Sequence, residues 1–277
     1  MDRFRCPSRI LLVLWLTLIA LPAHGLPEGQ WYEARTEHAT VYANVGRAEL
    51  ARFVDRAHWL RAALRSPVSR EPFLDRPPTP THVYIFADAD AYRPYQHREG
   101  GGPAFVDGTH FGRPHAGYVT LNGASPRADR ALVHELVHRS LPHGIPRWAE
   151  EGLAEVYASV APVDGRLLVG APDPVHAEAL AGDWLPLSEL LTVDDLGAPR
   201  YRVGRARTLF YAQSWLLVHY LWSDPTRRNE WLTMLRAGRP PTLPNPDALR
   251  RHLDAGPRPI DLGPVPPPPP TPAPPTK

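Results

Sequence analysis

Two histidines and a glutamate near the middle of the chain have the spacing of a zinc site. In the run His134-Glu135-Leu136-Val137-His138 the histidines are four residues apart, so in a helix both imidazoles project from one face and can reach a single zinc ion. Glu135 lies on the adjacent stripe, where its carboxylate can take a proton from a water molecule that the zinc activates. The alternative is two surface histidines on an amphipathic helix. Apolar neighbours instead predict that the histidines point inward: Leu132, Val133, Leu136, Val137 and Leu141.

The next helical segment offers a third zinc ligand. Glu151 and Glu155 are four residues apart in the run that begins at Pro146, and therefore share a helical face. Glu151 could bind the zinc while Glu155 accepts the N–H of a liganding histidine, most simply His134, and so fixes its ring. Gly152 has no side chain, which predicts a close approach of this helix to the first one. Glu150 points about a quarter turn away, and we expect it to be solvated.

This pair of segments resembles a known family. The zinc motif followed by Trp148-x-x-Glu151-Gly152-x-Ala154-Glu155 is similar to the gluzincin metallopeptidases, most closely to bacterial peptidase MA-like domains. The resemblance covers about residues 115–222. It implies a zincin-like fold, peptide-bond hydrolysis and Glu151 as the third zinc ligand. The link from His138 to Glu151 is shorter than in the zinc aminopeptidases of this group and suits a tight helix-turn-helix.

The resemblance also implies a role for Tyr211. In related gluzincin aminopeptidases a tyrosine that begins a comparable helix donates its hydroxyl to the developing oxyanion. A phenol beside zinc can stabilise charge that appears only in the transition state. Tyr211, near the start of the apolar segment 205–222, is therefore the candidate oxyanion donor.

Other histidines are weaker candidates as ligands. The metzincin pattern requires a glycine and a histidine where this chain has Leu141 and Gly144, so that ligand set does not fit. His143, in the link between the two helices, is a minor alternative ligand. His110 and His115 are lone histidines near a strand and are interpreted as surface or substrate-cleft residues.

The elements that must position these residues follow from hydrophobic periodicity and turn residues. A helix is predicted from Ser125-Pro126 to Leu141, and a second from Ile145-Pro146 to about residue 159. A strand at 115–121 precedes the first helix. If it lies at a sheet edge, an extended peptide could pair with it, which makes Ala116, Gly117 and Tyr118 candidate substrate-binding residues. An interior strand that touches no substrate is the alternative.

The remaining segments predict an α+β fold: a small N-terminal mixed sheet with one long helix, then a mainly helical half that carries the metal. Strands are expected within 31–46 and at 82–86 and 166–169. Helices are expected at 47–65, 184–191, 205–222, 229–237 and 246–253.

The N-terminal segment predicts export, and the C-terminal segment predicts a disordered tail. Residues 1–25 combine arginines, a short apolar run and the small-residue site Ala23-His24-Gly25, which is the pattern of a signal peptide. Its removal takes three Arg and one Asp and leaves equal numbers of basic and acidic residues, which gives no support to nucleic-acid or anionic-membrane binding. The only cysteine, Cys6, leaves with it. We expect a peptidase domain at 26–256 and a proline-rich disordered tail at 257–277.

The sequence thus predicts a periplasmic or secreted metallopeptidase with one zinc ion per chain, a peptide or protein substrate and no stable membrane span after cleavage of the signal peptide. His134, His138 and Glu151 would bind zinc, and Glu135 would act as general base. Two other functions stay open: a non-catalytic exported module in which zinc ties two helices together, and a zinc hydrolase of a non-peptide amide. The oligomeric state is not predicted.

Overall fold

A computed structural model describes residues 29–36, 39–69, 80–96, 107–113, 115–142, 144–201, 204–237 and 244–267. The fold is a mixed α+β fold, as the sequence predicts, with a five-stranded and a three-stranded sheet among these residues. The expected signal peptide at 1–25 lies outside the described residues, as does His143.

The five-stranded sheet has the order β1-β2-β3-β5-β4 and is mixed, as predicted. Strand β2 is parallel to β3, and β3 to β5, whereas β1 and β4 are antiparallel to their neighbours. Val41, Val83 and Val119 are fully buried on one face because alternate residues of a strand point to the same side. The strands are β1 (Tyr32–Arg35), β2 (Ala39–Ala43), β3 (Thr81–Phe86), β4 (Gly108–Arg113) and β5 (Ala116–Asn122).

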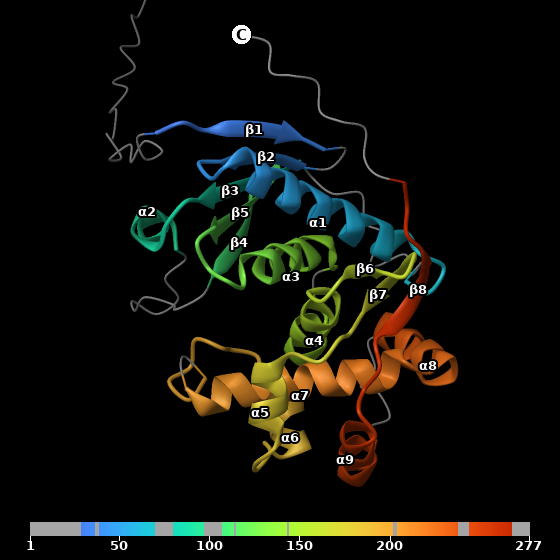
Figure 1. The fold of residues 1–277 in the computed structure, drawn as a ribbon. Coiled ribbons are helices and arrows are strands. Elements are labelled where there is room, and N and C mark those ends of the chain that lie inside the picture. The colour runs from blue at the N-terminus through green and yellow to red at the C-terminus, as the bar shows by residue number, and fades with distance from the viewer. Residues whose placement is uncertain are drawn as a thin grey trace, which may run out of the picture.

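Helices α1 (Arg47–Arg65) and α3 (Ala128–Ser140) cover this apolar face (Figure 1). Phe53 of α1 and Leu132 of α3 are fully buried against the sheet. The sequence predicts that α3 starts at Ser125. Instead, residues 125–127 form a turn in which Ser125 Oγ accepts a hydrogen bond from the Arg127 backbone N–H (3.1 Å). The short helices α2 (Ala89–Tyr92) and η1 (Arg93–Tyr95) follow β3.

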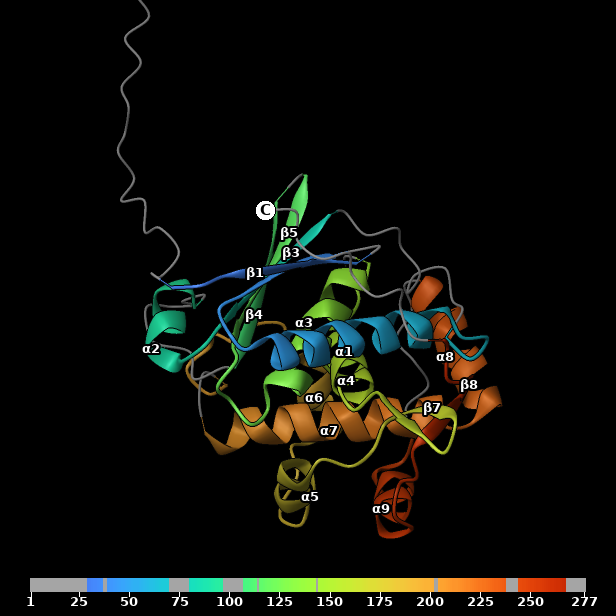
Figure 2. The ribbon, with the colours of Figure 1, turned by 45° about the horizontal axis from the view of Figure 1, so that its top comes forward.

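The mainly helical half is built around α4 (Arg147–Tyr157) and α7 (Arg205–Trp222). Figure 2 shows α7 running across α4 on the side away from the sheet. Helix α7 is buried almost all round because its residues are apolar on every face. The other helices are α5 (Pro174–Leu180), α6 (Leu187–Thr192), α8 (Pro225–Arg236) and α9 (Pro246–Asp254). The prediction missed α5.

Gly152 sets the spacing of α4 and α7, not that of α4 and α3 as the sequence predicts. A Cβ placed on Gly152 would lie 2.4 Å from Val218 Cγ2 and 2.5 Å from the Ser214 carbonyl oxygen, both on α7. The absent side chain therefore allows the backbones of these two helices to approach closely.

The prediction of a disordered tail from residue 257 is wrong for residues 260–264. These residues form β8 (Ile260–Pro264), which pairs with β7 (Arg166–Val169), and β7 in turn pairs with β6 (Ala161–Val163). Ile260 and Leu262 are buried in the core of the helical half, which gives this segment the apolar anchor that its prolines do not suggest. Residues 268–277 lie outside the described part of the chain.

The prediction that Ala116, Gly117 and Tyr118 lie at a sheet edge is also wrong. Strand β5 pairs with β3 on one side and β4 on the other, so its main-chain groups are already used. In the described residues the edge nearest to α3 is β4. Within the same residues, no helix combines the length and the apolar character needed to cross a membrane.

Candidate metal centre

Helices α3 and α4 and the short link between them bring the candidate ligands together. Helix α3 ends where Leu141 turns to an extended conformation before Pro142, and α4 begins after Pro146. Gly144 takes a φ of 86°, a conformation that glycine adopts without strain. The tight link folds α4 back against α3, so that residues 134–138 face residues 150–155.

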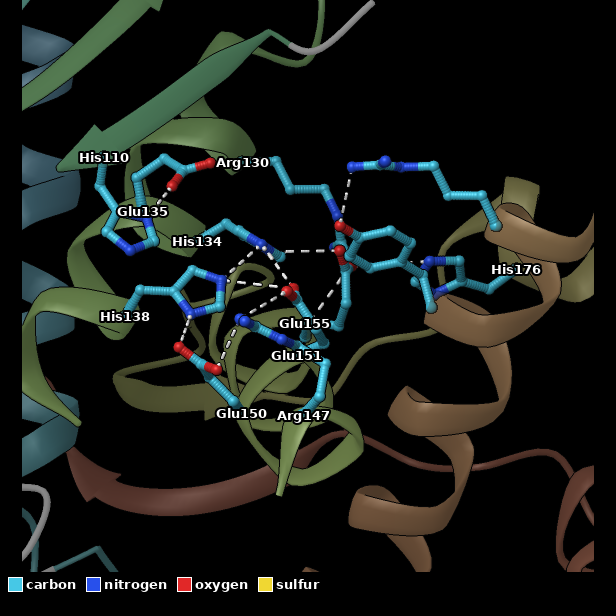
Figure 3. Close-up of polar contacts among 12 residues, drawn as sticks. His110, Arg130, His134, Glu135, His138, Arg147, Glu150, Glu151, Glu155 and His176 are labelled. Carbon is cyan, nitrogen blue, oxygen red and sulfur yellow. Dashed lines mark hydrogen bonds and ion pairs between the residues drawn. The ribbon is translucent and has the colours of Figure 1, made fainter. Parts of the chain in front are cut away.

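Three donor atoms converge between the helices (Figure 3). The His134 Nε2 and His138 Nε2 atoms are 3.0 Å apart, and each is 3.3 Å from Glu151 Oε2. A tetrahedral zinc ion with ligands at 2.0–2.1 Å would require donor separations of about 3.3 Å. Glu151 Oε2 is buried and accepts no hydrogen bond from any described residue. The donor set therefore fits a zinc ion in both spacing and chemistry, two imidazoles and a carboxylate.

Each imidazole is also held at its other nitrogen. His134 Nδ1 lies 3.2 Å from Glu155 Oε1, the contact that the sequence predicts. His138 Nδ1 lies 3.1 Å from Glu150 Oε1, so the prediction that Glu150 is solvated is wrong. Because a carboxylate only accepts, both Nδ1 atoms carry a hydrogen, and both Nε2 atoms face the shared space.

Arginines hold the two orienting carboxylates. Arg147 Nη1 donates to Glu150 Oε2 at 2.8 Å, and Arg130 donates to Glu155 Oε2. The Arg130 guanidinium also lies 3.1 Å from Asp173, the buried N-cap of α5. Helices α3, α4 and α5 are thereby linked around the site.

The carboxylates make the centre strongly favourable for positive charge. Burial would lower the pKa of His134, but its close contacts with the carboxylates of Glu151 and Glu155 outweigh burial and hold that pKa well above the usual range. For His138, burial is likewise outweighed by the charge of Glu151 and the hydrogen bond to Glu150, which raise the pKa to about 9. Burial would raise the pKa of Glu151, but the charge of His138 and the close contact with His134 hold it well below the usual range. A proton or a metal cation can satisfy this demand.

Glu135 has a partner that the sequence does not suggest. His110 Nδ1, on β4, lies 2.6 Å from Glu135 Oε2, and the His110 ring stacks on that of His138 with centroids 4.7 Å apart. Burial would raise the pKa of Glu135, but the hydrogen bond from His110 and the charge of His134 lower it, which keeps the carboxylate ionised. His110, Glu135 and His138 form a second group of potential metal donors.

Tyr211 lies beside the donor set, on α7. Its ring centroid is 6.2 Å from that of His134, and its hydroxyl accepts a hydrogen bond from Arg207 at 3.3 Å. Burial, followed by the charge of Glu151, raises the pKa of Tyr211 well above the usual range, so the phenol keeps its proton. A cavity of about 310 Å³ opens here, and His134, Glu135 and Tyr211 are part of its lining.

The other sequence-predicted site residues lie apart from this centre. Tyr118 points to the face of the sheet opposite α3, where it stacks on His82 and Phe111. Gly117 faces α3, but the Arg139 side chain covers it. One signal could have found His110: Gly108 and Gly112 flank it on the same face of the strand, which marks a close approach by another element.

Compared with known proteins, the chain matches none of the protein-family models and none of the curated protein sequences. The assignment of a function therefore rests on the geometry of the centre.

Proposed function

We propose that this protein is a zinc-dependent metallopeptidase of the gluzincin type, exported through its N-terminal segment and holding one zinc ion per chain. The observation that carries the proposal is the convergence of His134 Nε2, His138 Nε2 and Glu151 Oε2 at 3.0–3.3 Å, with Glu135 alongside. Three protein donors leave a fourth tetrahedral position open, as in catalytic zinc sites, whereas structural sites have four protein ligands. The open position favours an enzyme over a non-catalytic module in which zinc only links two helices.

The residues have complementary roles in amide hydrolysis. Zinc, when bound, supplies a Lewis acid that polarises a carbonyl and lowers the pKa of water. Glu135, ionised, takes the proton from the attacking water and passes it to the leaving nitrogen. Tyr211, protonated, donates its hydroxyl to the oxygen on which negative charge develops.

Among the described residues, β4 lies at the edge of the five-stranded sheet, and this edge supports an extended peptide as the substrate. The Asn122 N–H donates to the Asp107 carbonyl at 2.9 Å, and in an antiparallel pair such bonded positions alternate with non-bonded ones. The N–H and C=O groups of Gly108, His110 and Gly112 therefore point away from β5, toward the edge. A peptide paired there would run beside α3 and the metal ligands, which favours unstructured chain segments over folded proteins.

Cleavage of a mixed peptide library by the zinc-loaded chain, residues 26–277, tests the proposal, with Glu135→Gln as the matched variant. General acid–base catalysis contributes about 10²–10⁴-fold, so we expect Glu135→Gln to lose turnover by that factor and still bind zinc. If the wild type cleaves nothing, or if Glu135→Gln cleaves equally well, the proposal is wrong. Preferential attack on small cyclic amides would instead favour a non-peptide hydrolase.

Tyr211→Phe tests the oxyanion role separately. Removal of one oxyanion donor costs about 10²–10³ in kcat, and the ring itself is retained in phenylalanine. Phe210→Ala, which removes a fully buried neighbour, serves as the packing control. Full turnover in Tyr211→Phe would remove Tyr211 from the mechanism and leave the metal assignment untouched.

A further inference from the structure

His110 connects the proposed base to the edge of the sheet. Its side chain points to α3, where Nδ1 donates to Glu135 Oε2 at 2.6 Å and the ring stacks on His138 (Figure 3). Its main-chain N–H and C=O point the other way, to the side of β4 on which no described strand pairs, because His110 and Val119 form a non-bonded pair. One residue thus touches both the base and the place where a peptide would pair.

Glu135 depends on this contact for its orientation. In the part of the chain that the structure describes, no other side chain donates a hydrogen bond to Glu135. Gly108, two residues before His110, leaves room for the Glu135 side chain, because a Cβ on Gly108 would lie 3.2 Å from Glu135 Cγ. A free glutamate samples many rotamers, and fixing it in one costs conformational entropy. A base must also be held within about 0.5 Å of its productive position.

We propose that His110 is a positioning residue for Glu135, and that pairing of an extended peptide with the main chain of His110 couples substrate binding to alignment of the base. The proposal rests on the proposed function, because it assigns His110 to the same reaction. A bound peptide fixes β4, β4 fixes the His110 ring, and the ring fixes the Glu135 carboxylate. Binding of the peptide away from the scissile bond then contributes to the rate of the chemical step.

The first test compares His110→Ala with His110→Gln, which keeps an N–H donor, and with His115→Ala, an exposed histidine outside β4, as control. Loss of a group that orients a reacting residue costs about 10–100-fold in activity. We expect kcat to fall by that factor in His110→Ala, with KM and zinc affinity unchanged. We expect His110→Gln to recover most of the loss and His115→Ala to match the wild type. A kcat within twofold of the wild type in His110→Ala would overturn the proposal.

The second test asks whether His110 acts through Glu135. In a Glu135→Gln background, His110→Ala should lower the residual kcat no further, because residues that act as a unit are not additive. Additive losses would mean that His110 stabilises the fold or the substrate independently of Glu135, and would contradict the proposal.

The third test addresses the coupling to β4. With peptides of increasing length, kcat of the wild type should rise as residues that pair with β4 are added. In His110→Ala the dependence of KM on length should remain, and that of kcat should vanish. An unchanged dependence of kcat on length in the variant would disprove the coupling.

A binding measurement separates this inference from the proposed function. Acetohydroxamate chelates a metal through two oxygens and can donate its hydroxyl hydrogen to a neighbouring carboxylate, so its affinity for the zinc-loaded protein reports the position of Glu135 without turnover. If the wild type cleaves no peptide, the proposed function fails and the inference is judged on this affinity. We expect about tenfold weaker binding to His110→Ala than to the wild type or His115→Ala, and equal affinities would overturn it.

Discussion

Each imidazole of the candidate centre is held at Nδ1 by a carboxylate, and these contacts fix the orientation of the rings. Glu150 and Glu155 each hold an Nδ1–H, so neither ring can flip without losing a charge-assisted hydrogen bond. Their Nε2 atoms are therefore directed at the position next to Glu151 Oε2 before any metal arrives. Such prior orientation of donors raises the affinity for a metal because little conformational freedom is lost on binding.

Glu150→Ala is predicted to weaken zinc binding by about 10–100-fold, because the His138 ring loses the acceptor that fixes its tautomer and orientation. Competition with a fluorescent zinc chelator measures the affinity. Glu230→Ala, on the exposed face of α8, provides the control and should bind zinc as the wild type does. Equal affinities of Glu150→Ala and the control would show that Glu150 has no orienting role.

For single residues, the sequence predicts which side chains share one face of a helix. It does not predict contacts between side chains of different helices and strands. The spacing of His134 and His138, and of Glu151 and Glu155, places each pair on one helical face, and the structure brings these residues together. Their roles remain predictions. Glu150 and His110 depend on the crossing of α4 over α3 and on the strand order, neither of which local spacing encodes.

At the scale of elements, the long amphipathic or apolar segments are predictable and the short, distant pairings are not. Helices 47–65 and 205–222 have the predicted bounds because the first has apolar residues at a helical period and the second is a long, almost continuous apolar run. Strand β4 has Gly108, His110 and Gly112 at alternate positions in place of apolar residues, so no strand pattern is visible, and β5 then resembles an edge strand. Strand β8 requires a partner 95 residues away, as the Arg166–Asp261 contact shows.

The contact of α4 with α7 leads to a prediction for Gly152→Ala. Alanine favours a helix over glycine by about 1 kcal/mol, but its Cβ would collide with the Ser214 backbone, which cannot move independently of α7. We expect a net loss of about 1–3 kcal/mol in the free energy of unfolding, measured with urea. In Gly182→Ala the new Cβ meets only the end of the Arg205 side chain, so the change should stay below about 0.5 kcal/mol. Equal stabilities of the two variants would contradict the close packing of α4 and α7.

For the whole molecule, the centre concentrates charge in the interior. Glu151, Glu155 and His138 are buried, and Arg130 is largely so. Buried charges cost free energy unless they are paired, and here they neutralise one another across three helices. A divalent cation between α3 and α4 would add a bond among elements that otherwise meet through side-chain packing and ion pairs.

Zinc is therefore predicted to stabilise the folded chain. At a free concentration of about 1,000 times Kd the gain is about 4 kcal/mol, which for a domain of this size raises Tm by about 8–16 °C. Thermal unfolding with zinc and with a chelator measures the shift. His138→Ala should abolish the shift, whereas His115→Ala should keep it. A wild-type Tm that does not respond to zinc would argue against the metal centre.

The locality of the donor set has a kinetic consequence. His138 and Glu150 are 12 residues apart, and β7 and β8 must close a loop of nearly the whole helical half. Short loops close at a lower entropic cost and form sooner than long ones. Helices α3 and α4 can therefore pack together before the three-stranded sheet of β6, β7 and β8 has formed. A cation could bind its ligands at that stage. On this argument we expect the contacts between α3 and α4 to form earlier in folding than the pairing of β7 with β8.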